Sequence, residues 1–223
     1  MYRAIIFDMD GVLIDSEPLY HVSDRKFFDF LNMTLTEEDI ISMTGCSGTV
    51  IANKILSKNK NLPYSAEELA ETYDRYIANA LYGCKDLTLT NGAENWIRNL
   101  SEIGVKLAVG SSSTHEMVHY VLDRFDITKY FDAVVTSSEV KLTKPYPDIF
   151  LECAKRLETD PRYCLVIEDS LNGMKAAHSA GMKCAIYLET NEFPIDLSRF
   201  DEIIDSFSPD KLEYIKSLCQ EIR

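Results

Sequence analysis

The first twelve residues contain a short apolar run that ends in two carboxylates. The run Ala4-Ile5-Ile6-Phe7 is followed directly by Asp8-Met9-Asp10-Gly11. Residues i and i+2 of a strand point to the same face, so the side chains of Asp8 and Asp10 emerge together. A divalent cation would relieve their repulsion and would also neutralise a phosphate dianion. The segment predicts a buried strand that leads into a metal-assisted phosphoryl-transfer site, with an ordinary acidic turn as the alternative.

Length and charge limit the classes of protein to which the chain can belong. Its 223 residues are enough for one large core, or for a core with a small inserted domain. The net charge of −13 argues against partners such as nucleic acid or an anionic membrane, which select for clustered lysine and arginine. The six cysteines form no C-x-x-C pair, which favours reduced thiols. With no signal peptide or long apolar segment evident, we expect a cytoplasmic protein.

Downstream of residue 88, short apolar runs alternate with segments of helical spacing. This alternation is typical of βαβ units that build a parallel sheet. The predicted strands are Lys106–Gly110, Ala133–Thr136, Cys164–Glu168, Cys184–Tyr187 and Glu202–Ile204. The predicted helices are 91–103, His115–Phe125, Asp148–Leu157 and Gly173–Ala180. We therefore predict an α/β fold with a Rossmann-like parallel sheet.

The segment 16–87 differs from the rest, because apolar residues recur there at helical spacing and no strand is evident. One such set is Phe27, Phe28 and Leu31, and another is Leu69, Tyr73, Tyr76, Ile77 and Leu81. We predict a core made of 1–15 and 88–223, with 16–87 inserted as an all-helical cap domain. An insertion at this point lies above the carboxyl ends of the strands, where ligands bind, and can act as a lid.

Polar side chains occur at three later points of the predicted core. Ser111, Ser112 and Ser113 follow one strand, where hydroxyl and N–H groups either bind a phosphate or simply cap a helix. Lys144 lies on a loop restricted by two prolines, as a fixed cation or an ordinary solvated lysine. The adjacent pair 168–169, glutamate and aspartate, ends another strand, so it can meet the first carboxylates around one cation.

The order of these features resembles the haloacid dehalogenase-like superfamily, in the branch with a helical cap after the first motif. The segment Asp8-Met9-Asp10-Gly11-Val12 is similar to the first motif of that family, Ser111 to the second, Lys144 to the third and Glu168-Asp169 to the fourth. The resemblance spans essentially the whole chain. Because dehalogenase and phosphonate-cleaving members lack a carboxylate at the position of Asp10, the resemblance implies phosphotransferase chemistry.

The resemblance also implies a role for each matching residue. Asp8 would be the nucleophile that forms an aspartyl-phosphate, and Asp10 the general acid and base. The ligands of one Mg²⁺ would be Asp8, the backbone carbonyl of Asp10 and Asp169, while Glu168 would ligate through water or orient the others. The phosphate-binding residues would be Ser111, Ser112, Lys144 and Gly11. The sequence leaves the direction of the Asp10 pKa shift open, since carboxylates raise it and a cation lowers it.

The cap decides between a phosphatase and a hexose-phosphate mutase of the β-phosphoglucomutase kind. Mutases are expected to place a cation on the cap to hold a second phosphate, but the predicted cap loop 43–49 contains neither lysine nor arginine. We predict that Thr44, Cys46 and Ser47 of this loop meet the leaving group, unless the loop is only a turn between helices. Lys54, Arg75 and Lys85 are the alternative cap cations. We favour the phosphatase.

Three further expectations concern the cap and the partners. We expect His21 to be exposed, with a position inside the site as the alternative, and we expect Tyr73, Tyr76 and Tyr82 to pack the cap. The expected partner is a small phosphorylated metabolite, and the chain is expected to be a monomer. A non-catalytic binding module is a further alternative, although a module of that kind is expected to have lost a motif residue and none is missing here.

Overall fold

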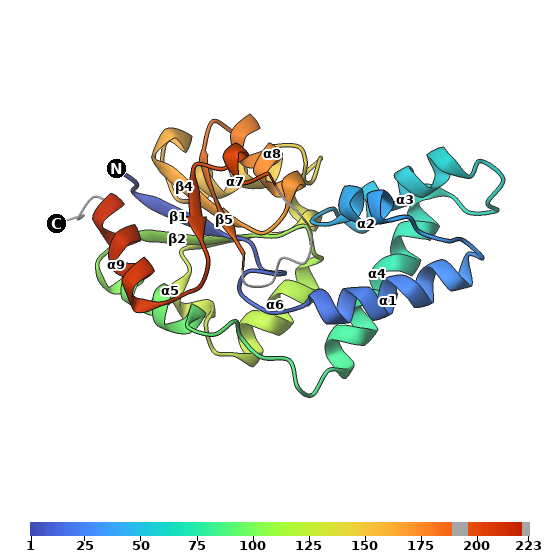
Figure 1. Ribbon diagram of the computed structural model, residues 1–223, viewed down its shortest axis with the longest axis horizontal. Helices are drawn as coiled ribbons and strands as arrows, with labels where there is room; N and C mark the ends of the chain where they lie inside the picture. The colour runs from blue at the N-terminus through green and yellow to red at the C-terminus, as the bar shows by residue number, and fades with distance from the viewer. Residues whose placement is uncertain (189–195, 220–223) are drawn as a thin grey trace.

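A computed structural model describes residues 1–188 and 196–219, which form a sheet-based core and a separate helical lobe (Figure 1). The strands of the described part are β1 (Ala4–Phe7), β2 (Lys106–Gly110), β3 (Ala133–Val135), β4 (Cys164–Glu168), β5 (Lys183–Tyr187) and β6 (Glu202–Ile204). They form one parallel sheet in the order β3-β2-β1-β4-β5-β6. The connections leave β1 toward β2 on one side and return to β4 on the other. The carboxyl ends of β1 and β4 therefore meet at the switch point, where such sheets bind ligands.

Helices cover both faces of the sheet (Figure 1). The core helices are α5 (Ala93–Glu102), α6 (His115–Arg124), α7 (Asp148–Arg156), α8 (Leu171–Ser179) and α9 (Pro209–Leu218). Ile5 and Phe7 of β1 belong to the apolar cluster that includes residues of α5, α6 and α9. Ala4 and Ile6, which alternate with them, belong to the cluster of α7 and α8. A strand buried on both faces explains the unbroken apolar run at the start of the sequence.

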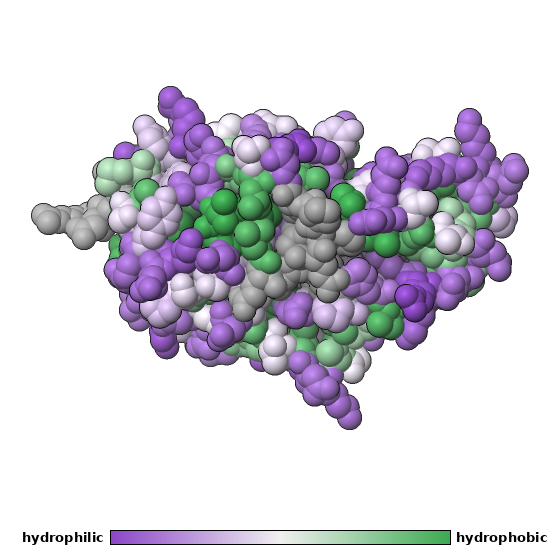
Figure 2. All heavy atoms as spheres, viewed as in Figure 1, coloured by the Kyte–Doolittle hydropathy of each residue, from purple (hydrophilic) through white to green (hydrophobic). Residues whose placement is uncertain are grey.

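The second lobe consists of the helices between β1 and α5. They are α1 (Glu17–Phe30), α2 (Glu37–Met43), α3 (Gly48–Lys58) and α4 (Ala66–Gly83), and α4 packs against both α1 and α3. Its apolar centre includes Phe27 and Tyr73, whose ring centroids lie 5.1 Å apart in an edge-to-face contact. Figure 2 shows that hydrophilic side chains predominate over the outer end of this lobe. The lobe is a helical cap whose buried apolar residues belong to the same cluster as residues of β1, α5 and α6.

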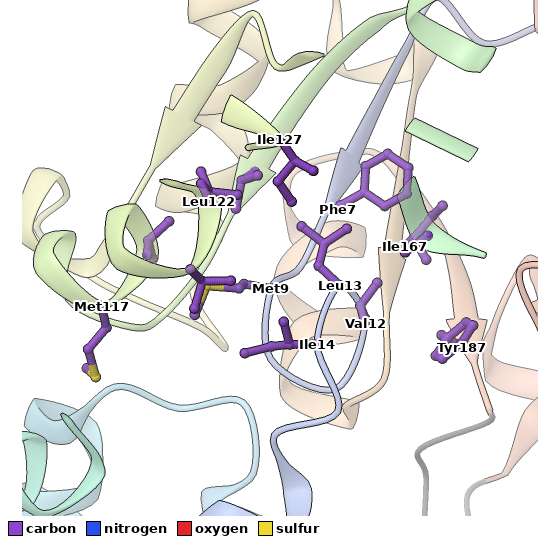
Figure 3. Packing of buried hydrophobic residues seen from close by; sticks show 14 of the residues in the cluster. Phe7, Met9, Val12, Leu13, Ile14, Met117, Leu122, Ile127, Ile167 and Tyr187 are labelled. Atoms are coloured by element: carbon purple, nitrogen blue, oxygen red, sulfur yellow. The ribbon is translucent and has the colours of Figure 1, made fainter. Parts of the chain in front are cut away.

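The loop after β1 is held by apolar side chains. Met9 and Leu13 are fully buried, and Figure 3 shows them with Ile14 at the end of β1 beside Phe7. The backbone carbonyl of Met9 accepts hydrogen bonds from the N–H groups of Leu13 at 2.9 Å and Ile14 at 3.1 Å. This packing fixes the backbone from which the two aspartates project.

The structure confirms the predicted α/β class, with a parallel sheet and a helical cap. Three of the five strands predicted after residue 88 match within their bounds, and the other two differ by one residue. Helix α8 begins at Leu171, two residues before the predicted start, because the Ser170 hydroxyl accepts a hydrogen bond from the Gly173 N–H at 3.0 Å and caps the helix. Helix α9 was missed. In the described part of the chain, no helix combines the length and the apolar character that a membrane span requires.

Candidate active site

Three carboxylates meet where β1 and β4 end. Asp8 follows β1, Glu168 is the last residue of β4, and Asp169 follows it. One oxygen from each lies within 4.8 Å of the others, and all three residues are buried. The parallel pairing of β1 with β4, with Phe7 opposite Ile167, places the residues that follow side by side. The predicted convergence of these acidic groups is therefore present in the fold.

Lys144 lies between two of these carboxylates. Its Nζ atom is 2.9 Å from Asp8 Oδ1 and 2.6 Å from Glu168 Oε1, and the side chain is fully buried. The two carboxylates raise the pKa of Lys144, although burial alone would lower it, so the lysine stays charged. Burial and the neighbouring Glu168 raise the pKa of Asp8 well above its usual value. One lysine thus faces three buried carboxylates, which leaves an excess of negative charge.

Glu168 has donors on both of its oxygens. Oε1 meets Lys144, while Oε2 accepts hydrogen bonds from the backbone N–H of Ser170 at 3.1 Å and from its hydroxyl at 2.9 Å. A Cβ atom on Gly173 would lie 1.9 Å from this carboxyl group, so only glycine leaves room for it. With both oxygens engaged, Glu168 is suited to orienting its neighbours.

Gly11 backs onto Asp169 and was predicted to bind phosphate through its backbone. The residue has a φ of +71°, and a Cβ atom there would lie 2.0 Å from Asp169 Oδ2. Glycine is therefore required both by its backbone conformation and by the close approach of the carboxylate. In the structure, the absence of a side chain at Gly11 leaves space for the carboxylate of Asp169.

Asp10 faces the cavity between core and cap. The Ser113 hydroxyl donates a hydrogen bond to Asp10 Oδ2 at 2.6 Å, and the hydroxyl of Tyr20, from α1 of the cap, is 3.4 Å from Ser113 Oγ. Burial raises the pKa of Asp10, while contacts with the hydroxyls of Ser113, Ser16 and Tyr20 oppose that rise. The net direction is upward, which suits a group that has to hold a proton. A cap residue thus takes part in the environment of a core carboxyl group.

The serine cluster after β2 divides its contacts. Ser111 is fully buried, and its hydroxyl accepts a hydrogen bond from the Ser113 N–H at 3.0 Å. Ser112 and Ser113 line the cavity, whereas Ser111 is not among its lining residues. No hydrogen-bond partner is found for the buried Ser112 Oγ within the described chain. Ser112 therefore offers a free hydroxyl beside the carboxylates.

The cavity lies between the core and the cap, with the carboxylates at its base. Its lining residues are Asp8, Asp10, Tyr20, His21, Asp24, Ile40, Met43, Thr44, Gly45, Cys46, Tyr73, Ser112, Ser113 and Asp169. Thr44 and Cys46 of the predicted cap loop are thus present, but Ser47 is not. The Ser47 hydroxyl instead lies 2.7 Å from Thr143 Oγ1 in a buried contact between cap and core.

Several residues of this cavity were not predicted. His21, for which exposure was favoured and a position inside the site was the alternative, is half-buried and lines the cavity. Tyr73 packs the cap as expected, but its hydroxyl also donates a hydrogen bond to Asp24 Oδ1 at 2.9 Å. Tyr20 and Asp24 are four residues apart on α1 and share a helix face. A polar pair at that spacing, continuous with the buried Phe27 and Phe28, was the signal available in the sequence.

Asn172 holds the cap loop against the core and was also missed. Its side-chain amide donates hydrogen bonds to the backbone carbonyls of Ser42 at 3.0 Å and Thr44 at 2.8 Å. Asn172 is buried at the start of α8, two residues after Ser170. The position of the cap loop over the cavity therefore depends on a contact from the core.

The carboxylate cluster fits a divalent cation. Its ligands are hard oxygen donors, they are close enough to share one ion, and Lys144 alone does not balance their charge. Mg²⁺ is typically held by one or two carboxylates together with water and substrate oxygens. Asp8 and Asp169 are the residues suited to direct ligation, since Glu168 is occupied by Lys144 and Ser170.

Comparison with known proteins places this arrangement among characterised folds. Residues 5–187 match the sequence model of the haloacid dehalogenase-like hydrolases. Hexitol phosphatase B of Escherichia coli (strain K12) is 30% identical over 185 residues, which are 82% of this chain and 82% of that protein. The fructose-1-phosphate phosphatase YqaB of the same strain is 31% identical over 182 residues, 81% of this chain and 94% of that protein. The crystal structure of β-phosphoglucomutase from Clostridium difficile has a TM-score of 0.81 at 28% identity, covering 97% of this chain and 96% of that one.

The carboxylate cluster predicts that a divalent cation stabilises the folded chain. At a hundredfold excess over its dissociation constant, Mg²⁺ would add about 2.7 kcal/mol, or roughly 5–10 °C in melting temperature for a domain of this size. We expect Gly11→Ala to remove this increase, because the added methyl group displaces Asp169. The measurement is the melting temperature with and without Mg²⁺.

Gly181→Ala is the matched control. Gly181 also has a positive φ, +76°, but a Cβ atom there would meet nothing within 4 Å. Both variants carry backbone strain, and only Gly11→Ala alters the carboxylates. An equal response of the two variants to Mg²⁺ would contradict the assignment of the ion to this cluster.

Proposed function

The chain belongs to the haloacid dehalogenase-like hydrolase family, and on that premise we propose that it is a Mg²⁺-dependent phosphatase that hydrolyses a small phosphorylated carbohydrate through an aspartyl-phosphate on Asp8. The observation that carries the proposal is the position of Asp8. Its carboxylate contacts Lys144, shares a cation-sized cluster with Asp169 and lines the same cavity as Asp10. A nucleophile, a phosphate-neutralising cation and a proton donor are thus within reach of one bound phosphate.

In the proposed reaction, Asp8 attacks the phosphorus atom of the substrate. Lys144 fixes Asp8 through its 2.9 Å contact and would offset the charge on the phosphoryl oxygens. The Ser112 hydroxyl would donate to one of those oxygens, while Ser111 holds the loop through the Ser113 N–H. The ion would be held by Asp8, the backbone carbonyl of Asp10 and Asp169. When bound, it supplies Lewis-acid stabilisation of the transferring phosphoryl group.

Asp10 is proposed to move the proton. In the first step it would protonate the departing oxygen of the substrate, and in the second it would take a proton from the water that attacks the aspartyl-phosphate. Its hydrogen bond from Ser113, backed by Tyr20, orients the carboxyl group toward the cavity. Because Tyr20 belongs to the cap, the acid is fully oriented only with the cap in place.

The relatives support a carbohydrate phosphate as the substrate. One is named a hexitol phosphatase and another a fructose-1-phosphate phosphatase. The cavity agrees with such a leaving group, because its cap side carries the hydroxyls of Tyr20, Thr44 and Tyr73. We propose that these groups meet the carbohydrate, with Cys46 beside them.

Hydrolysis is favoured over phosphate transfer between sugar positions. Within the described residues, the cavity lining contains neither lysine nor arginine. Lys54 is not a lining residue of the cavity; its Nζ donates to the Ser42 carbonyl and lies 3.6 Å from Cys46 Sγ, while Arg75 and Lys85 are exposed. A mutase needs a cation on the cap to hold a second phosphate, and none of the three candidates is a lining residue of the cavity.

Asp8→Asn is expected to abolish phosphate release. The amide keeps the size of the side chain but is a poor nucleophile, so turnover of p-nitrophenyl phosphate should fall by at least roughly 10³-fold. Asp126→Asn is the control, because Asp126 is a largely exposed residue of the α6–η1 turn, far along the chain from the site. Turnover retained by Asp8→Asn in Mg²⁺ would rule out the proposed nucleophile.

Asp10→Asn is expected to slow the enzyme in a way that depends on the leaving group. The amide retains an acceptor for Ser113 but cannot protonate the departing oxygen. A carbohydrate phosphate should therefore lose about 10²–10⁴-fold in kcat, the usual range for general acid–base catalysis. Aspartyl-phosphate formation from p-nitrophenyl phosphate, measured as the nitrophenolate burst, should lose far less. Equal losses on the two substrates would show that Asp10 is not the acid.

The choice between phosphatase and mutase is tested with β-glucose 1-phosphate and a bisphosphate primer. We expect inorganic phosphate to accumulate faster than glucose 6-phosphate, because no cap cation retains the intermediate. Both products are measured in the same reaction by coupled assays. Faster formation of glucose 6-phosphate would reverse the assignment and favour the mutase.

A further inference from the structure

We propose that Asp24 of the cap is a specificity-determining residue: its carboxylate accepts a hydrogen bond from a hydroxyl of the leaving group, and its charge excludes leaving groups that carry a second anionic group. The inference rests on the proposed phosphatase function and names the group that selects among phosphomonoesters.

The position of Asp24 is the first argument. It lies on α1 one turn after Tyr20 and lines the cavity whose opposite side holds Asp8 and Asp10. Figure 1 shows α1 running from the core into the cap, with α4 crossing it. A phosphate bound at Asp8 would direct the rest of its molecule toward this part of the cap. Asp24 is therefore within the space left for the leaving group.

The hydrogen bonding of Asp24 is the second argument. Oδ1 accepts a hydrogen bond from the Tyr73 hydroxyl at 2.9 Å, and the Tyr73 ring is itself fixed by its edge-to-face contact with Phe27. The carboxylate is thus held in one orientation. In the part of the chain that the structure describes, no donor is found for Oδ2. This second oxygen remains available to a hydroxyl of a bound substrate.

The electrostatic surroundings of Asp24 are the third argument. His21 and Arg25 belong to its own helix, Tyr73 faces it from α4, the apolar Ile40 lines the cavity from α2, and the core side carries acidic groups. Burial raises the pKa of Asp24 to about 6, which is opposed by Tyr73 and His21. The group is ionised at neutral pH in a place that disfavours charge. An ionised carboxylate that burial deprives of water is typical of a functional position.

The chemical consequence is a charge filter. A neutral polyol supplies hydroxyl donors to Asp24, while a carboxylate or second phosphate would face it with no lysine or arginine among the described lining residues to compensate. Selection of this kind requires the site to repel the wrong ligand as well as to bind the right one. The same residue thereby favours hydrolysis of sugar and polyol monophosphates over bisphosphates.

A purely structural role for the Asp24–Tyr73 pair is the competing explanation. The hydrogen bond joins α1 to α4 and would help to hold the cap together in any case. Asp24→Asn separates the two roles, because the amide oxygen still accepts from Tyr73 while the charge is lost. Asp29→Asn is the matched control: Asp29 lies on the same helix but is exposed, and it lines a second pocket that Asp24 also borders but not the cavity of the carboxylates.

The experiment compares kcat/KM for glucitol 6-phosphate, fructose 1,6-bisphosphate and p-nitrophenyl phosphate in Mg²⁺ at pH 7.5. For Asp24→Asn we expect kcat/KM to fall about tenfold for the hexitol phosphate and to rise by a similar factor for the bisphosphate. A tenfold change is the effect of about 1.4 kcal/mol of interaction with the charged group. Activity on p-nitrophenyl phosphate, which has no hydroxyl, should be unchanged. Asp29→Asn should match the wild type on all three.

The pH dependence has a definite sign. Asp24 carries its charge above about pH 6, so discrimination against the bisphosphate should be strongest at pH 7.5 and weaken at pH 5.5. The substrate phosphates also change their ionisation over this pH range, equally for the wild type and for Asp24→Asn. The ratio of kcat/KM values for the two sugar phosphates is therefore compared between the two proteins, and it should vary less with pH in Asp24→Asn. Because the folded chain binds this proton more tightly than the unfolded chain, Asp24→Asn should also melt at a higher temperature than the wild type at pH 8 and not at pH 4.

The outcomes separate this inference from the proposed function. In one outcome, Asp24→Asn hydrolyses p-nitrophenyl phosphate and its ratio of kcat/KM values for glucitol 6-phosphate and fructose 1,6-bisphosphate equals that of the wild type. This outcome would overturn the role of Asp24 and leave the proposed phosphatase function intact. Absence of hydrolysis by the wild type on every substrate would overturn both. A melting temperature of Asp24→Asn at or above that of the wild type shows that any loss of activity is not a loss of fold.

Discussion

The burial of Lys144 between Asp8 and Glu168 is the interaction on which the site depends. A fully buried ammonium group is stable only with close counter-charges, and here both carboxylates lie within 2.9 Å of it. Removing any one member would leave an uncompensated buried charge. The arrangement also fixes the direction of Asp8, which belongs to a short strand, and of Lys144, which belongs to a loop. The loop after β3 is thereby tied to the carboxyl ends of β1 and β4.

Polar contacts join the cap to the core beside an apolar cluster that includes buried residues of both lobes. Asn172 binds the backbone of the cap loop, Ser47 meets Thr143, and Tyr20 approaches Ser113. Such contacts exchange readily with water, so each contributes only about 0.5–1.5 kcal/mol. A lid that closes over a substrate and opens to release product requires contacts of this size. Thr143 precedes Lys144, and Asn172 follows Ser170, so the residues that close the cap adjoin those that organise the carboxylates.

The sequence predicted those parts of the site that follow from local patterns. Apolar strands can be located by composition, and parallel pairing brings their ends together, so Asp8 and Asp169 were predicted to converge. The burial of Lys144 was not evident, since its loop has no periodicity. Contacts between cap and core, such as that of Asn172, depend on how the two lobes are placed relative to each other. No pattern within either lobe encodes that placement, which is why Asp24 was missed although the segment 16–87 was predicted to be helical.

The two lobes treat charge in opposite ways. In the core, an excess of carboxylates is concentrated around one lysine, a group of oxygen ligands that could hold a cation. In the cap, Asp24 is a carboxylate with no lysine or arginine among the described lining residues of the cavity. With a cation bound in the core, an anionic substrate would be drawn to one end of the cavity and repelled from the other. Under the proposed function, that asymmetry would orient a monophosphate with its charged end toward Asp8, with no lysine or arginine among the described lining residues of the cavity.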